Sequence, residues 1–281
     1  MNARTFGFWL GAALLVAASA TDAQQAALKV GYGPFAQPVQ FLPNATNDNY
    51  KTFDPAGTMA QGALVEVMSA IAKDAGLQIQ FVAAAAGDLN PAGSGAQIPL
   101  TDGRGVDIAL ATGGPASPNA VLVDFTAPIY NNGDCVLVAK SDTKPYTSWD
   151  DLKGLAVGVQ KGQPADGPAQ KSGLFKDVKV YDNGPALEKA VSTGEVQAGL
   201  CGSTIAEAYK LGPAASPADQ ALGLQVVKTY QMKFPVAASI AVRKGNAQLL
   251  NTLNTSLAKL KANGTVKAIF AKYGIESVVV N

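Results

Sequence analysis

The chain has 281 residues, with 22 basic against 21 acidic side chains, 7% aromatic residues, two cysteines and no histidine. This length suits one large or two medium α/β domains with a sizeable core. The near-zero net charge and low aromatic content give no sign of a nucleic-acid partner. The absence of histidine excludes imidazole-based catalytic triads and the common zinc ligand sets, and we expect no cofactor.

The first residues predict an exported protein. Arg4 precedes an apolar run from Phe6 to Ala18, and small residues ending at Ala20 or Ala23 offer two cleavage sites. A membrane anchor is the less favoured alternative, because a span needs ~20 apolar residues. No cysteine lies near the cleavage sites, which argues against a lipid anchor. We therefore expect residues 1–23 to be a cleavable signal peptide.

Short apolar strands alternate with helices, which favours parallel α/β sheets. The predicted elements of the first half are a strand at Leu28–Tyr32, a polar loop at Gly33–Phe53, a helix at Gly62–Gly76, a strand at Leu77–Val82, a Gly- and Pro-rich loop at Asp88–Gly105, and strands at 107–111 and Cys135–Ala139. Within the helix, Val65, Met68 and Ile71 recur on one face, and Gly76 ends it.

The second half continues the alternation. Its predicted elements are a short capped helix at Ser148–Leu152, strands at Leu155–Val159 and Val178–Tyr181, a helix at Pro185–Thr193, a strand at Gln197–Cys201, a helix at Thr204–Lys210, a strand at Ser239–Arg243, and helices at Ala247–Ala262 and Val266–Tyr273. The two cysteines, Cys135 and Cys201, fall in predicted strands. An oxidising compartment permits a disulfide between them, and two buried free thiols are the alternative.

Four blocks of sequence, taken in order, resemble the periplasmic solute-binding proteins of family 3, which serve amino-acid ABC importers. These blocks are Asp54–Gly57 with Gly62–Glu66, Val123–Phe125 with Pro128 and Tyr130, Trp149–Gly154 with Val157–Gln160, and Ile240–Gly245 with Asn263–Thr265. The resemblance runs from about Leu28 to Gly274. It implies a monomer in the periplasm that binds a small molecule and docks on an inner-membrane permease.

The resemblance also implies the fold, which is α/β with the two lobes of the type II periplasmic-binding fold. Two crossing hinge strands would join lobe 1, at 24–133 and 238–281, to lobe 2, at 134–237. The lobes would close on a ligand by hinge bending.

Ligands of open α/β sheets bind outside the carboxyl ends of the strands. After the first strand, Phe35 occupies a place where the family stacks an aromatic ring on the ligand, and a core position is the alternative. After the strand at 107–111 come Thr112, Gly113 and Gly114. Small residues here would let backbone groups reach a ligand, with an ordinary glycine turn as the alternative.

Both charged anchors of the family's amino-acid site are missing. Asn119 replaces an arginine that grips the ligand carboxylate. Gln163 replaces a Ser or Thr at a helix start, and Gly202 replaces an aspartate that holds the ligand amine. Cys201 and Ser203 flank Gly202, and Ser203 either meets the ligand or caps the next helix.

A buried charged group without a partner is costly. We therefore expect a neutral or mono-anionic, amino-acid-like solute rather than a standard zwitterionic amino acid. Amides, backbone groups and an aromatic ring would hold it. Lys161 offers a positive charge beside Gln163, and we expect Asp166 to stabilise the start of a helix.

Two other functions stay open, an enzyme resembling cyclohexadienyl dehydratases and a non-transport periplasmic partner of a redox enzyme. Enzymatic chemistry needs a positioned acid or base in the cleft. No paired carboxylates follow the four strand ends, and Glu66 is the best isolated candidate, which we expect to cap its helix. The sequence therefore predicts a binding protein and not an enzyme.

Overall fold

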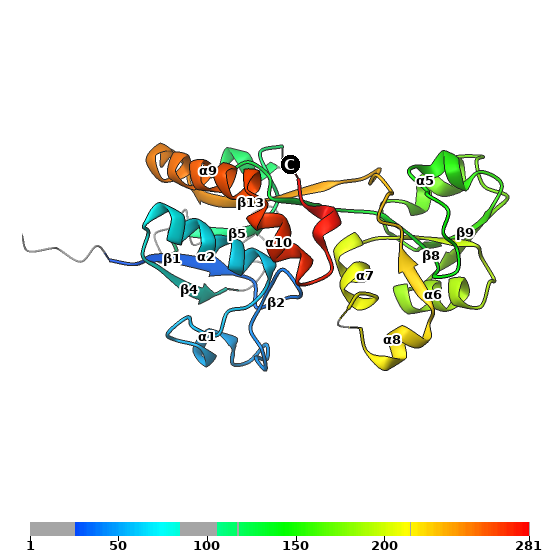
Figure 1. Ribbon diagram of the computed structural model, residues 1–281, viewed down its shortest axis with the longest axis horizontal. Helices are drawn as coiled ribbons and strands as arrows, with labels where there is room; N and C mark the ends of the chain where they lie inside the picture. Colours follow the sequence, from blue (N-terminus) through cyan, green and yellow to red (C-terminus); the bar gives the residue numbers. More distant parts are fainter. Residues whose placement is uncertain (1–25, 85–105, 117, 214, 281) are drawn as a thin grey trace, which may run out of the picture.

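The computed structural model describes residues 26–84, 106–116, 118–213 and 215–280. They form two α/β lobes that lie side by side along the longest axis of the molecule (Figure 1). The predicted signal peptide at 1–23 and the predicted loop at 88–105 lie outside the described residues. Each lobe has its own sheet, so the two-lobed α/β architecture agrees with the prediction.

Lobe 1 is built on a six-stranded sheet in the order β4-β1-β5-β13-β6, with β7 also pairing with β13. Its strands are β1 (Leu28–Tyr32), β4 (Ile79–Ala83), β5 (Ile108–Thr112), β6 (Val123–Phe125), β7 (Tyr130–Asn132) and β13 (Val236–Arg243), and a hairpin adds β2 (Phe35–Ala36) and β3 (Gln40–Phe41). Its helices are α1 (Tyr50–Phe53), α2 (Ala63–Ala75), η1 (Pro118–Val121), α9 (Ala247–Ala262), α10 (Thr265–Ala271) and η3 (Glu276–Val278).

Lobe 2 is built on a five-stranded sheet in the order β10-β9-β11-β8-β12. Its strands are β8 (Cys135–Ala139), β9 (Ala156–Gln160), β10 (Asp177–Tyr181), β11 (Ala198–Cys201) and β12 (Leu224–Val226). Its helices are η2 (Trp149–Leu152), α5 (Asp166–Lys171), α6 (Gly184–Ser192), α7 (Thr204–Lys210) and α8 (Pro217–Ala221).

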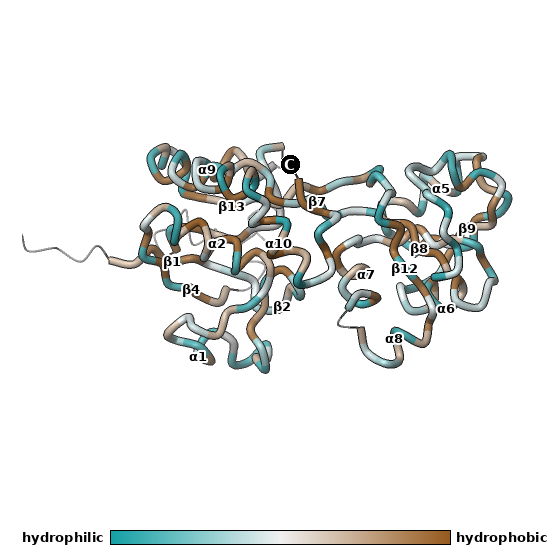
Figure 2. Tube along the Cα trace, viewed as in Figure 1, coloured by the Kyte–Doolittle hydropathy of each residue, from teal (hydrophilic) through white to brown (hydrophobic). Residues whose placement is uncertain are grey.

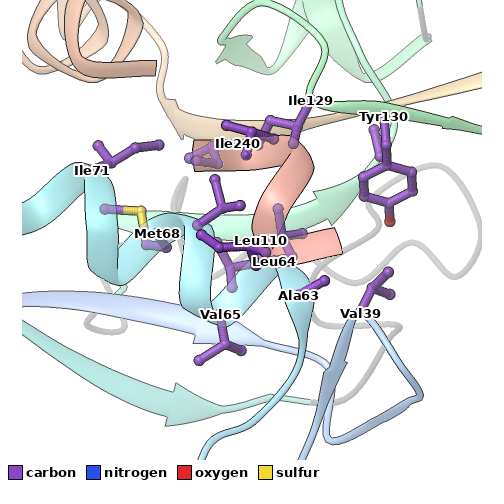
Figure 3. Close-up of a cluster of buried hydrophobic side chains, with 14 of the residues drawn as sticks. Val39, Ala63, Leu64, Val65, Met68, Ile71, Leu110, Ile129, Tyr130 and Ile240 are labelled. Atoms are coloured by element: carbon purple, nitrogen blue, oxygen red, sulfur yellow. The ribbon is translucent and has the colours of Figure 1, made fainter. Parts of the chain in front are cut away.

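The core of lobe 1 lies between helix α2 and its sheet (Figure 3). Leu64, Met68 and Ile71 recur three or four residues apart on α2, so they lie on one face, and all three are fully buried. They point toward Leu110 of β5 and Ile240 of β13. Full burial of such a side chain contributes roughly 1.5–3 kcal/mol, so this face fixes α2 on the sheet.

The strand ends that carry the predicted site share one edge in each lobe. Strands β1 and β5 are parallel neighbours, and so are β9 and β11. Their carboxyl ends therefore meet at the same edge of their sheets, where ligands of open α/β sheets bind. We call these the ligand edges of lobe 1 and lobe 2.

The chain crosses between the lobes twice, from β7 to β8 and from β12 to β13, and the two crossings touch. The buried Asp134 accepts hydrogen bonds from the Tyr230 hydroxyl at 2.5 Å and the Phe234 N–H at 2.7 Å. A Cβ on Gly133 would lie 2.5 Å from the Phe234 carbonyl oxygen, so only glycine fits there. We call this contact the hinge.

Several short elements differ from the sequence predictions. The predicted loop at Gly33–Phe53 contains the hairpin β2–β3 and helix α1. Helix α8 and strand β12 were not predicted, and of helix α5 only the start at Asp166 was expected. In lobe 2, Figure 2 shows hydrophobic segments along β8 and β12. Within the part of the chain that the structure describes, no helix has both the length and the apolar character needed to cross a membrane.

Candidate functional site

At the ligand edge of lobe 2, the structure brings Gln163 and Gly202 together. A Cβ built on Gly202 would overlap the Oε1, Cδ and Cγ atoms of Gln163. The backbone of Gly202 does not have a positive φ. A Cβ at 202 would therefore displace the Gln163 side chain, whereas the backbone at 202 does not itself require glycine.

The turn that carries Gln163 is held by a carboxylate. Asp166 Oδ2 accepts the Gly162 N–H at 2.9 Å, and Asp166 Oδ1 accepts from the Gln170 amide at 2.7 Å. Asp166 opens α5, so it has the structural position that the sequence suggested. Lys161 is exposed beside this turn.

Ser203 caps helix α7 and also connects the two lobes. Its hydroxyl accepts the Ala206 N–H at 3.3 Å and donates to Oδ1 of Asn132 at 3.2 Å. Asn132 ends strand β7 of lobe 1, and its Oδ1 also accepts the Ile205 N–H at 3.2 Å. The only hydroxyl proton of Ser203 is thus in use, which leaves one acceptor position for a ligand.

Cys201 ends strand β11 and lies directly opposite Cys135 on β8. Their Cα atoms are 5.0 Å apart, both side chains are buried, and the structure joins the two sulfur atoms. The Cys201 side chain is therefore turned away from any ligand, and only its backbone can meet one.

At the ligand edge of lobe 1, the two glycines pack against β13. Gly113 has φ 142°, and its carbonyl accepts the Ser239 N–H at 2.8 Å. A Cβ on Gly114 would lie 3.1 Å from Ala237 Cβ and 3.3 Å from Ser239 Oγ. Ser239 is fully buried, and its hydroxyl has no partner among the described residues. The positive φ favours glycine at 113, whereas a Cβ at 114 would only press on the side chains of Ala237 and Ser239.

The backbone places the other predicted residues of lobe 1. Thr112 ends β5 opposite Ala238 of β13, Phe35 begins β2, and Asn119 lies within the single turn η1. Sequence reasoning missed Gln40, which is buried and accepts the Gly33 N–H at 3.1 Å beside the end of β1. Its only sequence signal was its position in an Asn- and Pro-rich loop.

The residues next to η1 explain why Val123–Phe125 is distinctive. Lys244 donates to the Ala120 carbonyl at 2.8 Å and pairs with Asp124 at 2.7 Å. Asp124 also accepts the Gly245 N–H at 2.8 Å. Lys244, followed by the Gly245 N–H, lowers the pKa of Asp124. The Lys244 ammonium, which reaches the Ala120 carbonyl, is therefore already paired with a carboxylate.

Two cavities lie away from the predicted ligand residues. One, of about 610 Å³, lies between the end of α7, the second crossing segment and the end of α10, and we call it the interlobe cavity. The other, of about 700 Å³, lies against α9. Neither is lined by a predicted ligand residue, so the two ligand edges remain the candidate site.

The two sheets and the two segments that cross between them give the chain the bilobed α/β architecture of the solute-binding proteins. The chain belongs to the bacterial extracellular solute-binding proteins, family 3, whose profile matches residues 41–276. The family and fold class predicted from the four sequence blocks are thus confirmed.

Named relatives agree with this family. The chain is 28% identical to a probable histidine-binding protein of Neisseria gonorrhoeae, over 94% of each chain. It is 30% identical to a putative ABC transporter arginine-binding protein of Escherichia coli, over 88% of this chain and 96% of that one.

Two solved structures share the fold. The L-cystine solute receptor of Neisseria gonorrhoeae, in its unliganded open conformation, has a TM-score of 0.69 at 18% identity and covers 91% of this chain and 95% of its own. An ancestral cyclohexadienyl dehydratase has a TM-score of 0.65 at 21% identity, covering 88% of this chain and 92% of its own. The fold alone thus does not separate a binding protein from an enzyme.

Proposed function

We propose that this protein is the periplasmic solute-binding component of an ABC importer, monomeric and exported by the segment at 1–23. Its ligand is a neutral or mono-anionic amino-acid-like solute, bound between the two ligand edges and delivered to an inner-membrane permease. The observation that carries the ligand class is the Gln163 side chain, which lies where a side chain at 202 would otherwise stand. Lobe 2 therefore presents an uncharged amide.

Lobe 1 supports the same ligand class. Arg243 is the arginine among the described residues, and it pairs with Val123 at the end of β13 far from the ligand edge. Ala238 of β13 pairs with Thr112 at the ligand edge. It lies five residues before Arg243, or about 17 Å along the strand. No guanidinium from the described part of the chain therefore reaches the ligand edge of lobe 1.

The placement of the carboxylates favours binding without catalysis. Glu66 is the candidate acid, and the prediction that it caps its helix is wrong. Its carboxylate instead accepts a hydrogen bond from the Tyr273 hydroxyl at 2.8 Å and pairs with Lys272. The Glu66 carboxylate is thus engaged with protein groups and is not free to act as a general acid on a ligand.

A thermal-shift screen of the purified mature chain tests this proposal. A solute at 100 times its Kd stabilises by about 2.7 kcal/mol, which raises the Tm by roughly 5–10 °C in a chain of this size. We expect such shifts from small carboxamides or mono-carboxylates and none from L-arginine or L-histidine. A large shift with either cationic amino acid would contradict the ligand class. No shift with any polar solute would contradict the function.

A pair of glycine variants then tests the role of Gln163. Gly202→Ala adds a Cβ that displaces the Gln163 amide, so we expect at least tenfold weaker binding of whichever solute the screen identifies. Gly167→Ala is the matched control, because nothing lies within 4 Å of a Cβ at that position. Equal affinities measured by calorimetry for both variants would remove Gln163 from the binding site.

A further inference from the structure

A glycine that faces a glutamine amide follows one strand at each ligand edge. In lobe 2, the Gln163 amide lies where a side chain at Gly202, directly after β11, would stand. In lobe 1, Gly33 directly follows β1. A Cβ at Gly33 would lie 3.5 Å from Nε2 and 3.8 Å from Cδ of Gln40, and no other described atom comes within 4 Å of it. Both edges thus place an uncharged primary amide at the end of a strand.

The Gln40 amide has a fixed orientation. Gln40 is 4% exposed, and its Oε1 accepts the buried Gly33 N–H at 3.1 Å. The amide nitrogen cannot accept this hydrogen, so the oxygen must face Gly33. Nε2 then carries two N–H donors, which no described residue accepts. This nitrogen is not fully enclosed, unlike the Tyr32 hydroxyl, which is buried and also without a partner among the described residues. The side chain therefore offers donors, and no free acceptor, at the ligand edge of lobe 1.

The backbone on both sides of Gln40 is held in place. The Val39 carbonyl accepts the Leu64 N–H of α2 at 2.8 Å. Phe41 exchanges two backbone hydrogen bonds with Gln61, at 2.8 and 2.9 Å. The Gln40 donors are thus preorganised, which lowers the entropy cost of binding a solute.

The carboxylate near the end of β1 is already engaged. Burial, followed by the charge of Asp54, raises the pKa of Tyr32 to about 12, so this carboxylate lies within electrostatic reach of the strand end. Its two oxygens, however, accept the N–H groups of Thr58 and Met59 at 3.0 and 2.7 Å within their own loop. A cation would therefore meet the Gln40 donors without a free acceptor from Asp54.

We propose that Gln40 is a specificity-determining residue of the solute site, whose Nε2 donates to a carbonyl or carboxylate oxygen of the solute and disfavours a cationic group. Gln163 meets the solute from lobe 2 with a donor and an acceptor, because its amide has no partner among the described residues. The two amides select a solute with an oxygen acceptor at one end and a neutral polar group, such as a carboxamide, at the other. This assignment rests on the proposed function and narrows its ligand class.

Two probes of similar length test the assignment. Succinamate and β-alaninamide share a carboxamide, and at pH 7.5 the other end carries a carboxylate in the first and an ammonium in the second. In calorimetric titrations of the mature chain we expect succinamate to bind at least tenfold more tightly than β-alaninamide.

Gln40→Glu separates a contact with the solute from a purely structural role. The variant keeps an acceptor for the Gly33 N–H but replaces the donor nitrogen by an oxygen. We expect it to bind succinamate at least tenfold more weakly than the wild type does, and to bind β-alaninamide more tightly than succinamate. Gln248→Glu adds the same charge at an exposed position of α9 and should keep the wild-type order.

Nuclear magnetic resonance of the ¹⁵N-labelled wild type gives a second measurement, which serves if Gln40→Glu does not fold. The Nε2 resonance of Gln40 should shift when succinamate is added, whereas that of Gln248 should not. An unchanged Gln40 resonance in the presence of bound succinamate would show that the amide has only a structural role.

Equal binding of both probes to the wild type, tighter binding of β-alaninamide, or no binding of either would overturn the assignment. So would a loss of less than tenfold for succinamate in Gln40→Glu. A solute of another kind that binds in the thermal-shift screen would leave the proposed function standing, so the two proposals fail separately.

Discussion

Removal of the Asp134 carboxylate should weaken the hinge more than any surface change. Asp134 is fully buried and accepts two hydrogen bonds from the other crossing segment, from Tyr230 and Phe234. Asp134→Ala leaves two partly buried donors without their acceptor, at about 1–3 kcal/mol each. We therefore expect a loss of about 2–6 kcal/mol in the free energy of unfolding, a large part of the 5–15 kcal/mol typical of a domain.

Urea unfolding at pH 7 measures this loss, and the fluorescence of Trp149, whose ring centre lies 6.0 Å from that of Phe234, reports on the hinge directly. Asp134→Asn keeps one acceptor oxygen, so its loss should be smaller, about 1–2 kcal/mol. Asp48→Ala, at an exposed carboxylate, is the control and should change little. An Asp134→Ala variant within 1 kcal/mol of the wild type would refute the reasoning.

Three further variants test other parts of the structure. Gly133→Ala places a Cβ 2.5 Å from a carbonyl oxygen and should cost about 1–3 kcal/mol in urea unfolding, whereas unchanged stability would disprove the tight crossing. Replacing Cys135 and Cys201 by alanine removes a cross-link with a sequence separation of 66 and should lower the free energy of unfolding by about 4 kcal/mol. A thiol titration that finds two thiols in unfolded wild-type protein kept without reductant would show that the bond does not exist. The pKa of Glu207, raised from 4.5 to about 7, means that the folded state binds its proton more tightly, so stability should fall by at most about 3 kcal/mol as the pH rises from about 5 to 7. Glu207→Gln should flatten this slope, and wild-type stability that rises over the same range would contradict it.

Elements with a strong periodic pattern were predictable from the sequence. Helix α9 begins and ends at the predicted residues, Ala247 and Ala262, because Leu253 and Leu257 repeat on one buried face. Helix α7 also has its predicted bounds, set by the N-cap Ser203. Local signals were sufficient where a cap and an apolar stripe coincide.

The missed elements lack that stripe. Helix α8 has no buried residue, and α5, of which only the start was predicted, buries only Ala169. Strand β12 has three residues, and β2 and β3 have two each. Such short segments take their form from neighbouring elements, through contacts such as that of Gln40 with Gly33, and those contacts have no periodic trace in the sequence.

The sequence alone could identify Gly202 as unusual but could not explain it. Gln163 lies 39 positions earlier, and only the pairing of β9 with β11 brings the two residues together. The same holds for Glu188 and Lys210, which form an ion pair between two different helices. Neither pair has a spacing that a motif would reveal, because contacts between elements depend on the sheet order.

The hinge and the ligand edge of lobe 2 are joined through one short segment. Asn132 binds Ser203, and the carbonyls of Gly133 and Asp134 accept hydrogen bonds from the Thr204 backbone and hydroxyl at 2.8 and 3.0 Å. The side chain of Asp134 meanwhile holds the second crossing segment. A rotation at the hinge must therefore move the first turn of α7, directly after Gly202. Lobe motion and the geometry of the lobe 2 edge are thus mechanically coupled, so a variant at Asp134 should change solute affinity even though it touches no ligand.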